Sequence, residues 1–438
     1  MVLSDSVSPR LGTAHAVAAV LQRWRTDGPD AAQLELERLQ RLQPESVDCL
    51  LGQELGLRLR GASGPRLLVD GLWFVRPHGG ITRVWEQILR TWQLPGLVTA
   101  SAPVALIDRN SHLARTAAFP ALEARVIDPL DPDAVLQTAE ENAALVRDWA
   151  ASVFTSSWIS SSGTERPTCP ELAVVHDCLP ERYGVAEPLR QLRRRWLLGA
   201  TAHLAVSADT AADLEGLLRR PSGTVAWCHS APAELFAATV ADPAAQRLWR
   251  GLQQRAALRP PYVLLPATSA IGSYKNPELV AEALSQPSLQ TLQLVLCGIA
   301  ADQRRQELEA RFPALQGRCV AAGFTDLELA LAYGHALAVV IPSHAEGFGL
   351  PAIEAMASGA TVLLADSRGL REAGGAAAMR FGPRQPTQLA QLLALLLYSK
   401  SSAWLHSHLQ RRRLQRLAVL HPDLLGLALL ALARTLAP

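Results

Sequence analysis

The sequence predicts an α/β protein made of two Rossmann-like domains that face each other, preceded by an N-terminal helical extension. Short apolar runs alternate with helical patterns from Arg66 onward, the alternation stops at Ala231-Pro232, and it resumes after Arg259-Pro-Pro261. Such alternation is typical of parallel sheets with crossover helices. With 438 residues, the chain is also longer than a single hydrophobic core usually supports.

Four regions are predicted along the chain. Residues 1–62 form the helical extension, residues 63–245 and 246–386 form the two Rossmann-like domains, and residues 387–438 form C-terminal helices that cross back. In the extension, Val17, Val20, Leu21 and Trp24 recur at helical spacing, which indicates an amphipathic helix. The extension either packs against its own domain or offers a surface for dimerisation or another partner.

The predicted strands are short apolar runs, each followed by a loop or a helical pattern. In the first domain they are residues 67–72, 104–108, 125–128, 153–156, 172–177, 203–207 and 224–229. In the second domain they are residues 262–266, 292–297, 319–323, 337–342 and 361–366. Ligands bind outside the carboxyl ends of parallel strands, so the loops after these runs are expected to carry the site.

The composition argues against several classes of protein. The formal net charge is +2, which gives no general reason to expect a nucleic acid as partner. The six cysteines are scattered without paired spacing, so neither a zinc site nor a disulfide framework is expected. The first residues lack the apolar core of a signal peptide, and the apolar tail 414–436 contains Asp423 and Arg434. A cytoplasmic protein without a membrane span is predicted.

The most informative segment is Glu346-Gly-Phe-Gly-Leu-Pro-Ala-Ile-Glu354, which follows the apolar run 337–342. Pro351 favours the start of a helix, so Glu346 lies on a loop at a strand end and Glu354 lies in the first turns of a helix. Gly347 and Gly349 leave the backbone accessible to a phosphate at the positive end of that helix. Carboxylates accept hydrogen bonds from sugar hydroxyls, so the segment predicts a site for a diphosphate flanked by hydroxyl-rich groups.

The alternative is an ordinary crossover with solvated glutamates, since isolated acidic residues are mostly exposed. The segment Leu337 to Gly374 nevertheless resembles the donor-binding signature of retaining glycosyltransferases with the GT-B fold, of the family-four type and mannosyltransferase-like group 1. The resemblance implies that the first domain is the acceptor side and the second is the donor side. It implies that Glu354 holds ribose hydroxyls and that Glu346 contacts the donor sugar as a catalytic residue. The donor-binding residues between them are Gly347, Phe348, Gly349 and Leu350.

Lys275 is one of only two lysines in a chain whose other basic side chains are arginines. A lysine amid that bias indicates that a compact ammonium is needed there. Its setting, Ser273-Tyr-Lys-Asn-Pro277, resembles the step that contacts the donor diphosphate in the same group, with Lys275 catalytic and Asn276 donor-binding. Many members place an arginine about five residues before this lysine or directly before it, but this chain has Ala270 and Tyr274 there. Another arginine, or Lys275 with loop amides, then meets the phosphate charge.

Further loops resemble the same group. In His78-Gly-Gly-Ile-Thr-Arg83, Gly79 and Gly80 are predicted to border the donor diphosphate, and Arg83 is placed on the acceptor side. In His176-Asp177-Cys-Leu-Pro-Glu181, His176 is predicted as a catalytic residue near the transferred sugar, neutral or charged near pH 7, with Asp177 on the acceptor side. A tight turn and a satisfied strand-end histidine are the structural alternatives. Glu372 lies in a loop that matches one near the donor.

Two other patterns have mainly structural interpretations. Asp131-Pro-Asp133 matches a metal-binding Asp-x-Asp pattern, but it lies in a proline turn, so no metal is predicted. The arginine-rich segment 189–198 either contacts an anionic membrane surface or forms the solvated face of a helix packed on its own core.

The resemblance implies transfer of a sugar, with retention, from a nucleoside diphosphate sugar to a hydroxyl acceptor, either a glycan or a lipid-linked glycan. No cofactor is expected beyond the nucleotide-sugar substrate. Two alternatives stay open: a non-enzymatic sugar-nucleotide-binding scaffold or sensor, and a sugar-nucleotide epimerase of the same fold. A nicotinamide dehydrogenase is disfavoured because no GxGxxG sequence opens a helix.

Overall fold

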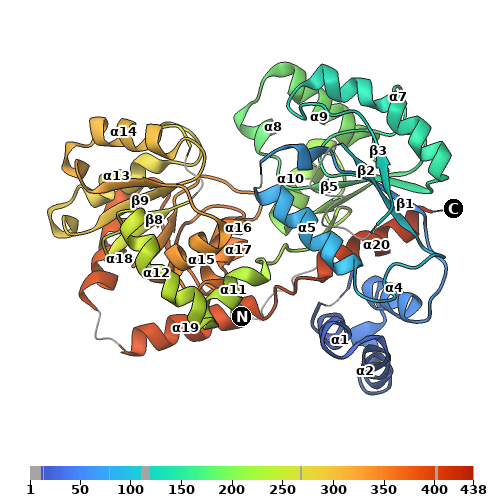
Figure 1. Ribbon diagram of the computed structural model, residues 1–438, viewed down its shortest axis with the longest axis horizontal. Coiled ribbons are helices and arrows are strands. Elements are labelled where there is room, and N and C mark those ends of the chain that lie inside the picture. The colour runs from blue at the N-terminus through green and yellow to red at the C-terminus, as the bar shows by residue number, and fades with distance from the viewer. Residues whose placement is uncertain are drawn as a thin grey trace. The chain divides into compact units, whose positions relative to one another are not determined.

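The computed structural model describes residues 11–12, 14–77, 79–109, 119–266, 269–399 and 403–437. The chain divides into two compact units. Unit 1 comprises Met1–Ser230 and His421–Pro438, and unit 2 comprises Ala231–Leu420. Each unit contains a parallel sheet with helices packed around it (Figure 1).

Unit 1 contains a seven-stranded sheet with the order β3-β2-β1-β4-β5-β6-β7, in which every neighbouring pair is parallel. Its strands are β1 (Leu67–Asp70), β2 (Val104–Asp108), β3 (Ala121–Glu123), β4 (Val153–Ser156), β5 (Glu171–Val175), β6 (Ala202–Ala205) and β7 (Ala226–Trp227). The strands β1, β4 and β5 are buried along their whole length. Burial on both faces explains why residues 67–69 and 172–175 are apolar without alternation, although each of the three strands also contains a buried polar residue. The direction of the strand order reverses between β1 and β4.

The predicted strand at residues 125–128 is wrong. The third strand lies earlier, at Ala121–Glu123, where Leu106 of β2 pairs in register with Ala121. The chain leaves the sheet at Ala124, and the backbone N–H of Arg125 donates to the carboxylate of Glu141 instead of to a strand. An edge strand that is mostly exposed has little apolar signal, so its position could not be found from hydrophobicity.

The helices of unit 1 surround the sheet and include the N-terminal extension. They are α1 (Ala14–Asp27), α2 (Pro29–Leu42), α3 (Pro44–Val47), α4 (Leu50–Leu59), the 3-10 helix η1 (Leu72–Val75), α5 (Gly80–Trp92), α7 (Pro132–Trp149), α8 (Leu179–Tyr183), α9 (Glu187–Gly199), α10 (Ala208–Leu218) and α20 (Leu424–Leu436). α5 follows β1 and η1 in the chain. In α9, the apolar residues Leu192, Trp196 and Leu197 are buried within unit 1, and the exposed side chains of Arg190, Arg194 and Arg195 favour the interpretation of a solvated helix face. Arg193 is an exception, because it is buried and pairs with Glu181 at 2.7 Å.

The extension packs against the returning C-terminal helix. α20 contacts α1, α4, α5 and the strands β5 and β6, and lies beside α5 (Figure 1). Asp423, fully buried before α20, pairs with Arg25 of α1 and accepts a 2.8 Å hydrogen bond from Thr91 Oγ1 of α5. Glu54 of α4 likewise pairs with Arg58, at 2.6 Å, and with Arg434 of α20. These contacts agree with the interpretation that the extension covers its own domain.

Unit 2 contains a six-stranded parallel sheet with the order β10-β9-β8-β11-β12-β13. Its strands are β8 (Tyr262–Leu265), β9 (Gln293–Cys297), β10 (Cys319–Ala322), β11 (Ala338–Ile341), β12 (Val362–Ala365) and β13 (Met379–Phe381). Five of these strands follow the predicted runs, and β13, a three-residue edge strand, was not predicted. The strand order reverses between β8 and β11.

The helices of unit 2 pack around this sheet. They are α11 (Glu234–Ala241), α12 (Pro243–Arg255), α13 (Pro277–Leu284), η2 (Pro287–Leu289), α14 (Ala301–Arg311), η3 (Pro313–Leu315), α15 (Asp326–His335), α16 (Leu350–Ala357), α17 (Leu370–Gly374), α18 (Pro386–Tyr398) and α19 (Ala403–Leu417). The division between the units falls at Ala231 rather than at the predicted residue 246, because α11 packs on α15 and α16. Helices α18 and α19 stay with unit 2, and the chain returns to unit 1 only at His421.

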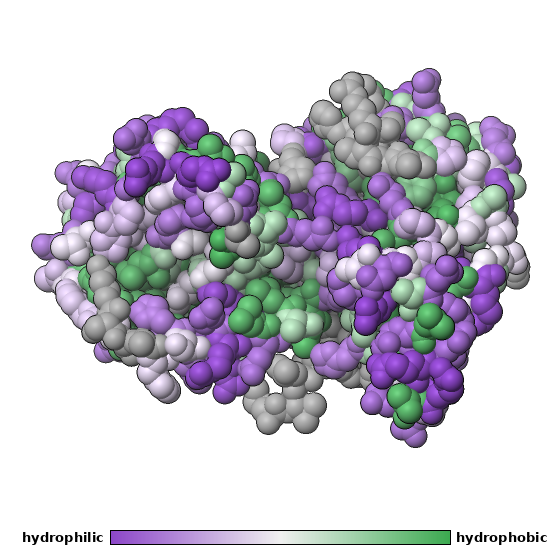
Figure 2. All heavy atoms as spheres, turned by 60° about the horizontal axis from the view of Figure 1, so that its bottom comes forward, coloured by the Kyte–Doolittle hydropathy of each residue, from purple (hydrophilic) through white to green (hydrophobic). Residues whose placement is uncertain are grey.

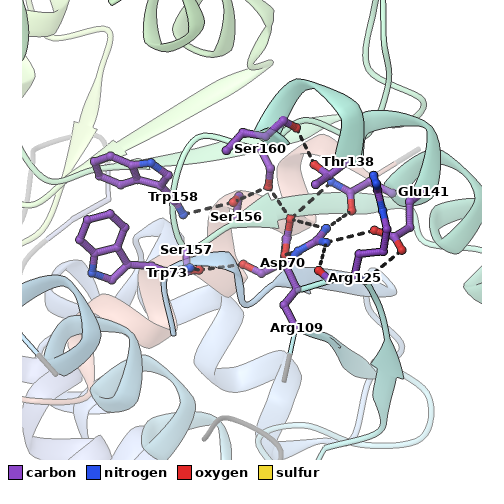
Figure 3. Close-up of polar contacts among 12 residues, drawn as sticks. Asp70, Trp73, Arg109, Arg125, Thr138, Glu141, Ser156, Ser157, Trp158 and Ser160 are labelled. Carbon is purple, nitrogen blue, oxygen red and sulfur yellow. Dashed lines mark hydrogen bonds and ion pairs between the residues drawn. The ribbon is translucent and has the colours of Figure 1, made fainter. Parts of the chain in front are cut away.

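A buried polar network joins β1, β2 and α7 in unit 1 (Figure 3). Arg109, directly after β2, donates to both carboxylate oxygens of Asp70 at 2.8 and 3.2 Å, and both side chains are fully buried. The same guanidinium donates to Glu141 at 3.0 Å and to Asn142 at 2.7 Å. Ser160 Oγ donates to Asp70 Oδ2 at 2.5 Å. The network fixes the carboxyl ends of β1 and β2, where the loops of a parallel sheet begin.

The surface in view in Figure 2 contains both hydrophobic and hydrophilic residues. Among the residues coloured there, hydrophobic ones occur in several separate groups between hydrophilic ones. Across the described parts of the chain, every helix falls short of the length and apolar character that crossing a membrane requires. All six cysteines are free thiols.

Candidate donor-binding site

The predicted site segment forms the loop between β11 and α16 in unit 2. β11 ends at Ile341, and α16 begins at Leu350 with Pro351 in its first turn, as the sequence indicates. Gly349 precedes the helix with φ 110° and ψ 53°, a conformation that L-residues rarely adopt. Phe348 is buried and anchors the loop, whereas Gly347 stays partly accessible.

Lys275 and Glu346 meet in an ion pair. The Lys275 Nζ donates to Glu346 Oε1 at 2.7 Å, with 22% and 11% of the two side chains exposed. Lys275 follows β8 and Glu346 follows β11, and these adjacent strands are where the order of the unit 2 sheet reverses. Ligands of open α/β sheets bind at such a reversal, outside the carboxyl ends of the strands. The structure therefore brings together two of the three residues predicted as catalytic.

Backbone and side-chain contacts hold the two loops in place. The backbone N–H of His344 donates to the Tyr274 carbonyl at 2.7 Å, and the Lys275 Nζ lies 5.2 Å from the Tyr274 ring centroid. Asn276, buried and in the left-handed region with φ 52°, donates through Nδ2 to the carbonyls of Pro342 and Pro383 at 3.3 and 2.9 Å. Asn276 thus uses its amide to join three segments. Its predicted contact with the donor stays a prediction.

Glu354 lies in α16, with 1% of the residue exposed. Glu354 is the fifth of the eight residues of this helix. Glu372 lies in α17 and is partly buried. The roles of both glutamates in donor binding stay predictions, as does that of Leu350.

The loop after β12 packs closely against the Glu346 loop. Gly369 has φ 73°, and a Cβ atom placed on it would lie 2.2 Å from the Glu346 carbonyl oxygen. Ser367 Oγ donates to the Ser343 carbonyl at 2.9 Å. Arg416 of α19 is buried and donates to the carbonyls of Ala373 and Glu372 at 2.9 and 2.7 Å. Burial lowers the pKa of Arg416 to about 10, although the negative charge of Glu372 acts in the opposite direction. Gly369 and Arg416 were not predicted as site residues, because their contacts arise only from tertiary packing.

Replacing Gly369 by alanine is expected to strain the site loop. The methyl group has no room beside the Glu346 carbonyl, and the positive φ disfavours a Cβ in any case. We expect the variant to lose about 2–3 kcal/mol of unfolding free energy in urea titrations. The matched control is Gly317→Ala, since Gly317 has φ 70° but a Cβ added to it would meet nothing within 4 Å. Equal losses in the two variants would contradict the packing explanation.

The residues predicted in unit 1 lie on two of its loops. Gly79 precedes α5 in an extended conformation, and Gly80 is the first residue of α5. His78 of the same motif lies outside the described residues. Arg83, partly buried, lies in the first turn of α5, and its backbone N–H donates to the Gly79 carbonyl at 3.0 Å. These residues lie in unit 1, whereas the Lys275–Glu346 pair lies in unit 2.

His176 directly follows β5 and is half-buried. Burial of the ring, and secondarily the charge of Arg193, lower its pKa to about 4, so its imidazole is neutral at pH 7. In the described part of the chain, its Nε2 atom is shielded from solvent and has no hydrogen-bond partner. Asp177 Oδ1 accepts from the Leu179 backbone N–H at 3.0 Å, which forms an Asx turn directly before the short helix α8. His176 is therefore suited to bind a ligand as a neutral donor or acceptor, while Asp177 shapes the loop.

Among the described residues, no group of three or more His, Cys, Asp or Glu side chains is arranged to hold a metal ion. The Asp131 carboxylate instead accepts from the backbone N–H groups of Asp133 and Ala134 at 3.0 and 3.2 Å. It is the N-cap of α7.

The two doubly wound parallel sheets, each with its strand-order reversal, define the GT-B class of folds. Residues 254–410 match the family described as glycosyl transferases group 1. These residues lie within unit 2 and include the Lys275–Glu346 pair.

Solved structures share the fold, and a curated relative matches a short part of the chain. A glycosyltransferase from Rickettsia africae superposes with a TM-score of 0.62 at 17% identity, covering 83% of this chain and 96% of the other. The Anabaena protein Alr3699/HepE, solved in complex with UDP and glucose, superposes with a TM-score of 0.61 at 17% identity. The superposition covers 82% of this chain and 97% of the Anabaena chain. A D-inositol 3-phosphate glycosyltransferase from Frankia alni is 46% identical over 72 residues, which span 16% of this chain and 18% of that protein.

Proposed function

We propose that this protein transfers a hexose from a nucleoside diphosphate sugar to a hydroxyl acceptor, with retention of the anomeric configuration. The observation that carries the proposal is the Lys275–Glu346 ion pair at the strand-order reversal of the unit 2 sheet, directly before the N-terminus of α16. An ammonium, loop amides and a helix N-terminus at one place suit a diphosphate. A carboxylate beside them suits the hydroxyl groups of the attached sugar.

The chemistry follows from where charge develops. As the glycosidic bond breaks, the anomeric carbon becomes oxocarbenium-like and negative charge grows on the leaving diphosphate. The Lys275 ammonium and the N–H groups that open α16 stabilise this charge once the donor is bound. When the donor binds, Lys275 exchanges Glu346 for phosphate oxygens, and Glu346 becomes available to the donor sugar. Glu354 holds the ribose, and neutral His176 hydrogen-bonds the transferred sugar.

A uridine nucleotide is the first donor to test. Alr3699/HepE, which shares the fold at 17% identity, was solved with UDP and glucose. The positive groups described above can meet the diphosphate charge, so the proposed transfer is independent of metal. The proposed setting is the cytoplasm, and the acceptor is a glycan or a lipid-linked glycan.

The test is a panel of UDP-, GDP- and ADP-hexoses offered with a mixed pool of glycan and lipid-linked acceptors, with and without EDTA. We expect release of the nucleoside diphosphate together with an increase of acceptor mass by one hexose, unchanged by EDTA. The anomeric configuration of the product is read by NMR. Tight nucleotide binding without turnover would favour the sensor hypothesis, and interconversion of donors without any mass gain would favour the epimerase.

A pair of variants tests the donor site within the same experiment. Glu354→Ala is expected to weaken calorimetric binding of UDP by about tenfold or more, because it removes a buried charged hydrogen-bond partner. Glu282→Ala changes an exposed glutamate on α13 and should leave the affinity unchanged. Equal UDP affinities for the two variants and the wild type would remove Glu354 from the site.

A further inference from the structure

A pair of tryptophans occupies the strand-order reversal of the unit 1 sheet. Trp73 lies in η1, which begins directly after β1, and Trp158 follows β4 by one intervening residue. β1 and β4 are adjacent and parallel, and the strand order reverses between them. This is the place in an open α/β sheet where ligands bind. Unit 1 therefore has a second candidate binding position, formed by residues that the proposed donor site does not use.

The two indole rings are rigidly held against each other. Their centroids are 4.2 Å apart with an interplanar angle of 38°. The backbone N–H of Trp73 donates to Ser157 Oγ at 2.9 Å, and Trp158 Nε1 donates to the Pro129 carbonyl at 2.9 Å. Figure 3 shows both rings extending to the same side, away from the Asp70–Arg109 network that fixes the strand ends behind them.

Both tryptophans are only partly buried, although large aromatic side chains gain most from full burial. Polar groups lie close to them in the chain. Arg76, in the loop after η1, pairs with Asp128 at 3.7 Å, and both side chains are exposed. Asp128 immediately precedes Pro129, the residue that binds the Trp158 indole. A partly exposed aromatic pair, with a guanidinium and a carboxylate on the adjoining chain segments, offers stacking area together with hydrogen-bond donors and acceptors.

We propose that Trp73 and Trp158 form a platform for a pyranose ring of a carbohydrate acceptor, with Arg76 and Asp128 binding its hydroxyl groups. The C–H face of a sugar ring is apolar and slightly positive, so it complements the negative face of an indole. At a centroid distance of 4.2 Å the two indoles cover each other's facing sides, so the sugar stacks on an outer face of the pair. This inference rests on the proposed function and specifies its acceptor as a saccharide that binds through its ring.

The first test measures binding without any donor, so its result is independent of transfer activity. Saturation-transfer NMR is recorded on the full chain with methyl and octyl glycosides of glucose, galactose and mannose. We expect saturation concentrated on the ring C–H protons of one sugar face for at least one glycoside. Saturation confined to the octyl chain would overturn the proposal in favour of an apolar lipid contact, and no saturation for any glycoside would also overturn it.

Variants then locate the bound sugar. Trp73→Ala and Trp158→Ala should each weaken glycoside binding by about tenfold. Trp73→Phe should retain most of the affinity, because phenylalanine still offers an aromatic face to the sugar. The matched control is Trp149→Ala. Trp149 is a partly buried tryptophan of unit 1 whose carbonyl binds Arg66, the residue before β1, at the opposite end of the strands. If Trp149→Ala reduces binding as much as Trp73→Ala, the platform is wrong.

The same variants separate this inference from the proposed function. In transfer assays with saccharide acceptors, Trp73→Ala should raise the acceptor KM by about tenfold and leave the donor KM unchanged. If Trp73→Ala transfers sugar with an unchanged acceptor KM, the platform proposal is wrong and the transferase proposal stands. Ring saturation in a wild-type protein that transfers nothing from any donor would overturn the transferase and leave the saccharide platform in place.

Discussion

Replacing Lys275 by alanine should lower kcat for sugar transfer by about 10²–10³-fold, the usual cost of losing one donor that stabilises transition-state charge. Lys275 is the ammonium at the strand-order reversal of unit 2, paired with Glu346 at 2.7 Å. Negative charge on the leaving diphosphate is larger in the transition state than in the bound donor. Loss of Lys275 therefore affects kcat more than the donor KM.

Lys275→Arg makes the prediction more specific. A guanidinium keeps the charge, but it is planar and larger than the ammonium that fits between the Tyr274 ring and Glu346. We expect the arginine variant to recover no more than about a tenth of the wild-type rate. Initial rates over a range of donor concentrations, with release of nucleoside diphosphate as the signal, give kcat and KM for each variant.

Lys400→Ala is the control, because Lys400 is the other lysine of the chain and outside the predicted site. It should transfer at the wild-type rate. A melting temperature within a few degrees of the wild type shows that Lys275→Ala still folds, since partly exposed ion pairs contribute only about 1 kcal/mol. Transfer by Lys275→Ala within threefold of the wild-type rate would exclude Lys275 from the reaction.

The sequence was most informative where burial and chain direction act together. Residues 338–341 and 362–365 are apolar because parallel strands are covered on both faces, so hydrophobicity alone located the runs that contain them. Lys275 and Glu346 were predicted on separate loops, and the parallel order of β8 and β11 explains why they meet. Edge strands escaped prediction at β3 and β13, where exposure removes the apolar signal.

Other features needed the tertiary structure. Gly369 is required by the Glu346 carbonyl beside it, and nothing near Gly369 in the sequence reveals that neighbour. Arg416 lies in a helix rich in arginines, yet its guanidinium is buried against the carbonyls of α17. Trp73 and Trp158 come together only because β1 and β4 are neighbours in the sheet. In each case, the partner lies on a different element, so spacing along the chain carries no information about it.

Removing Arg109 should destabilise unit 1 by about 3–5 kcal/mol, because the variant leaves the Asp70 carboxylate buried without its counter-charge. Both side chains are fully buried, and the guanidinium also binds Glu141 and Asn142. Arg109→Met keeps most of the side-chain volume, so the loss reports the charge and hydrogen bonds rather than a cavity. Hydrogen exchange under native conditions measures this, with peptides from β1, β2 and β4 compared with peptides from β8 and β11.

The peptides of unit 2 are an internal control and should exchange as in the wild type. A second control is Arg23→Met, which breaks a 2.7 Å ion pair with Asp27 on the exposed face of α1 and should cost less than about 1 kcal/mol. The double variant Arg109→Met with Asp70→Asn should recover part of the loss, because it leaves no unpaired charge in the core. If Arg109→Met and Arg23→Met lose the same stability, the buried network does not hold the strand ends, and the rigid support inferred for Trp73 and Trp158 fails with it.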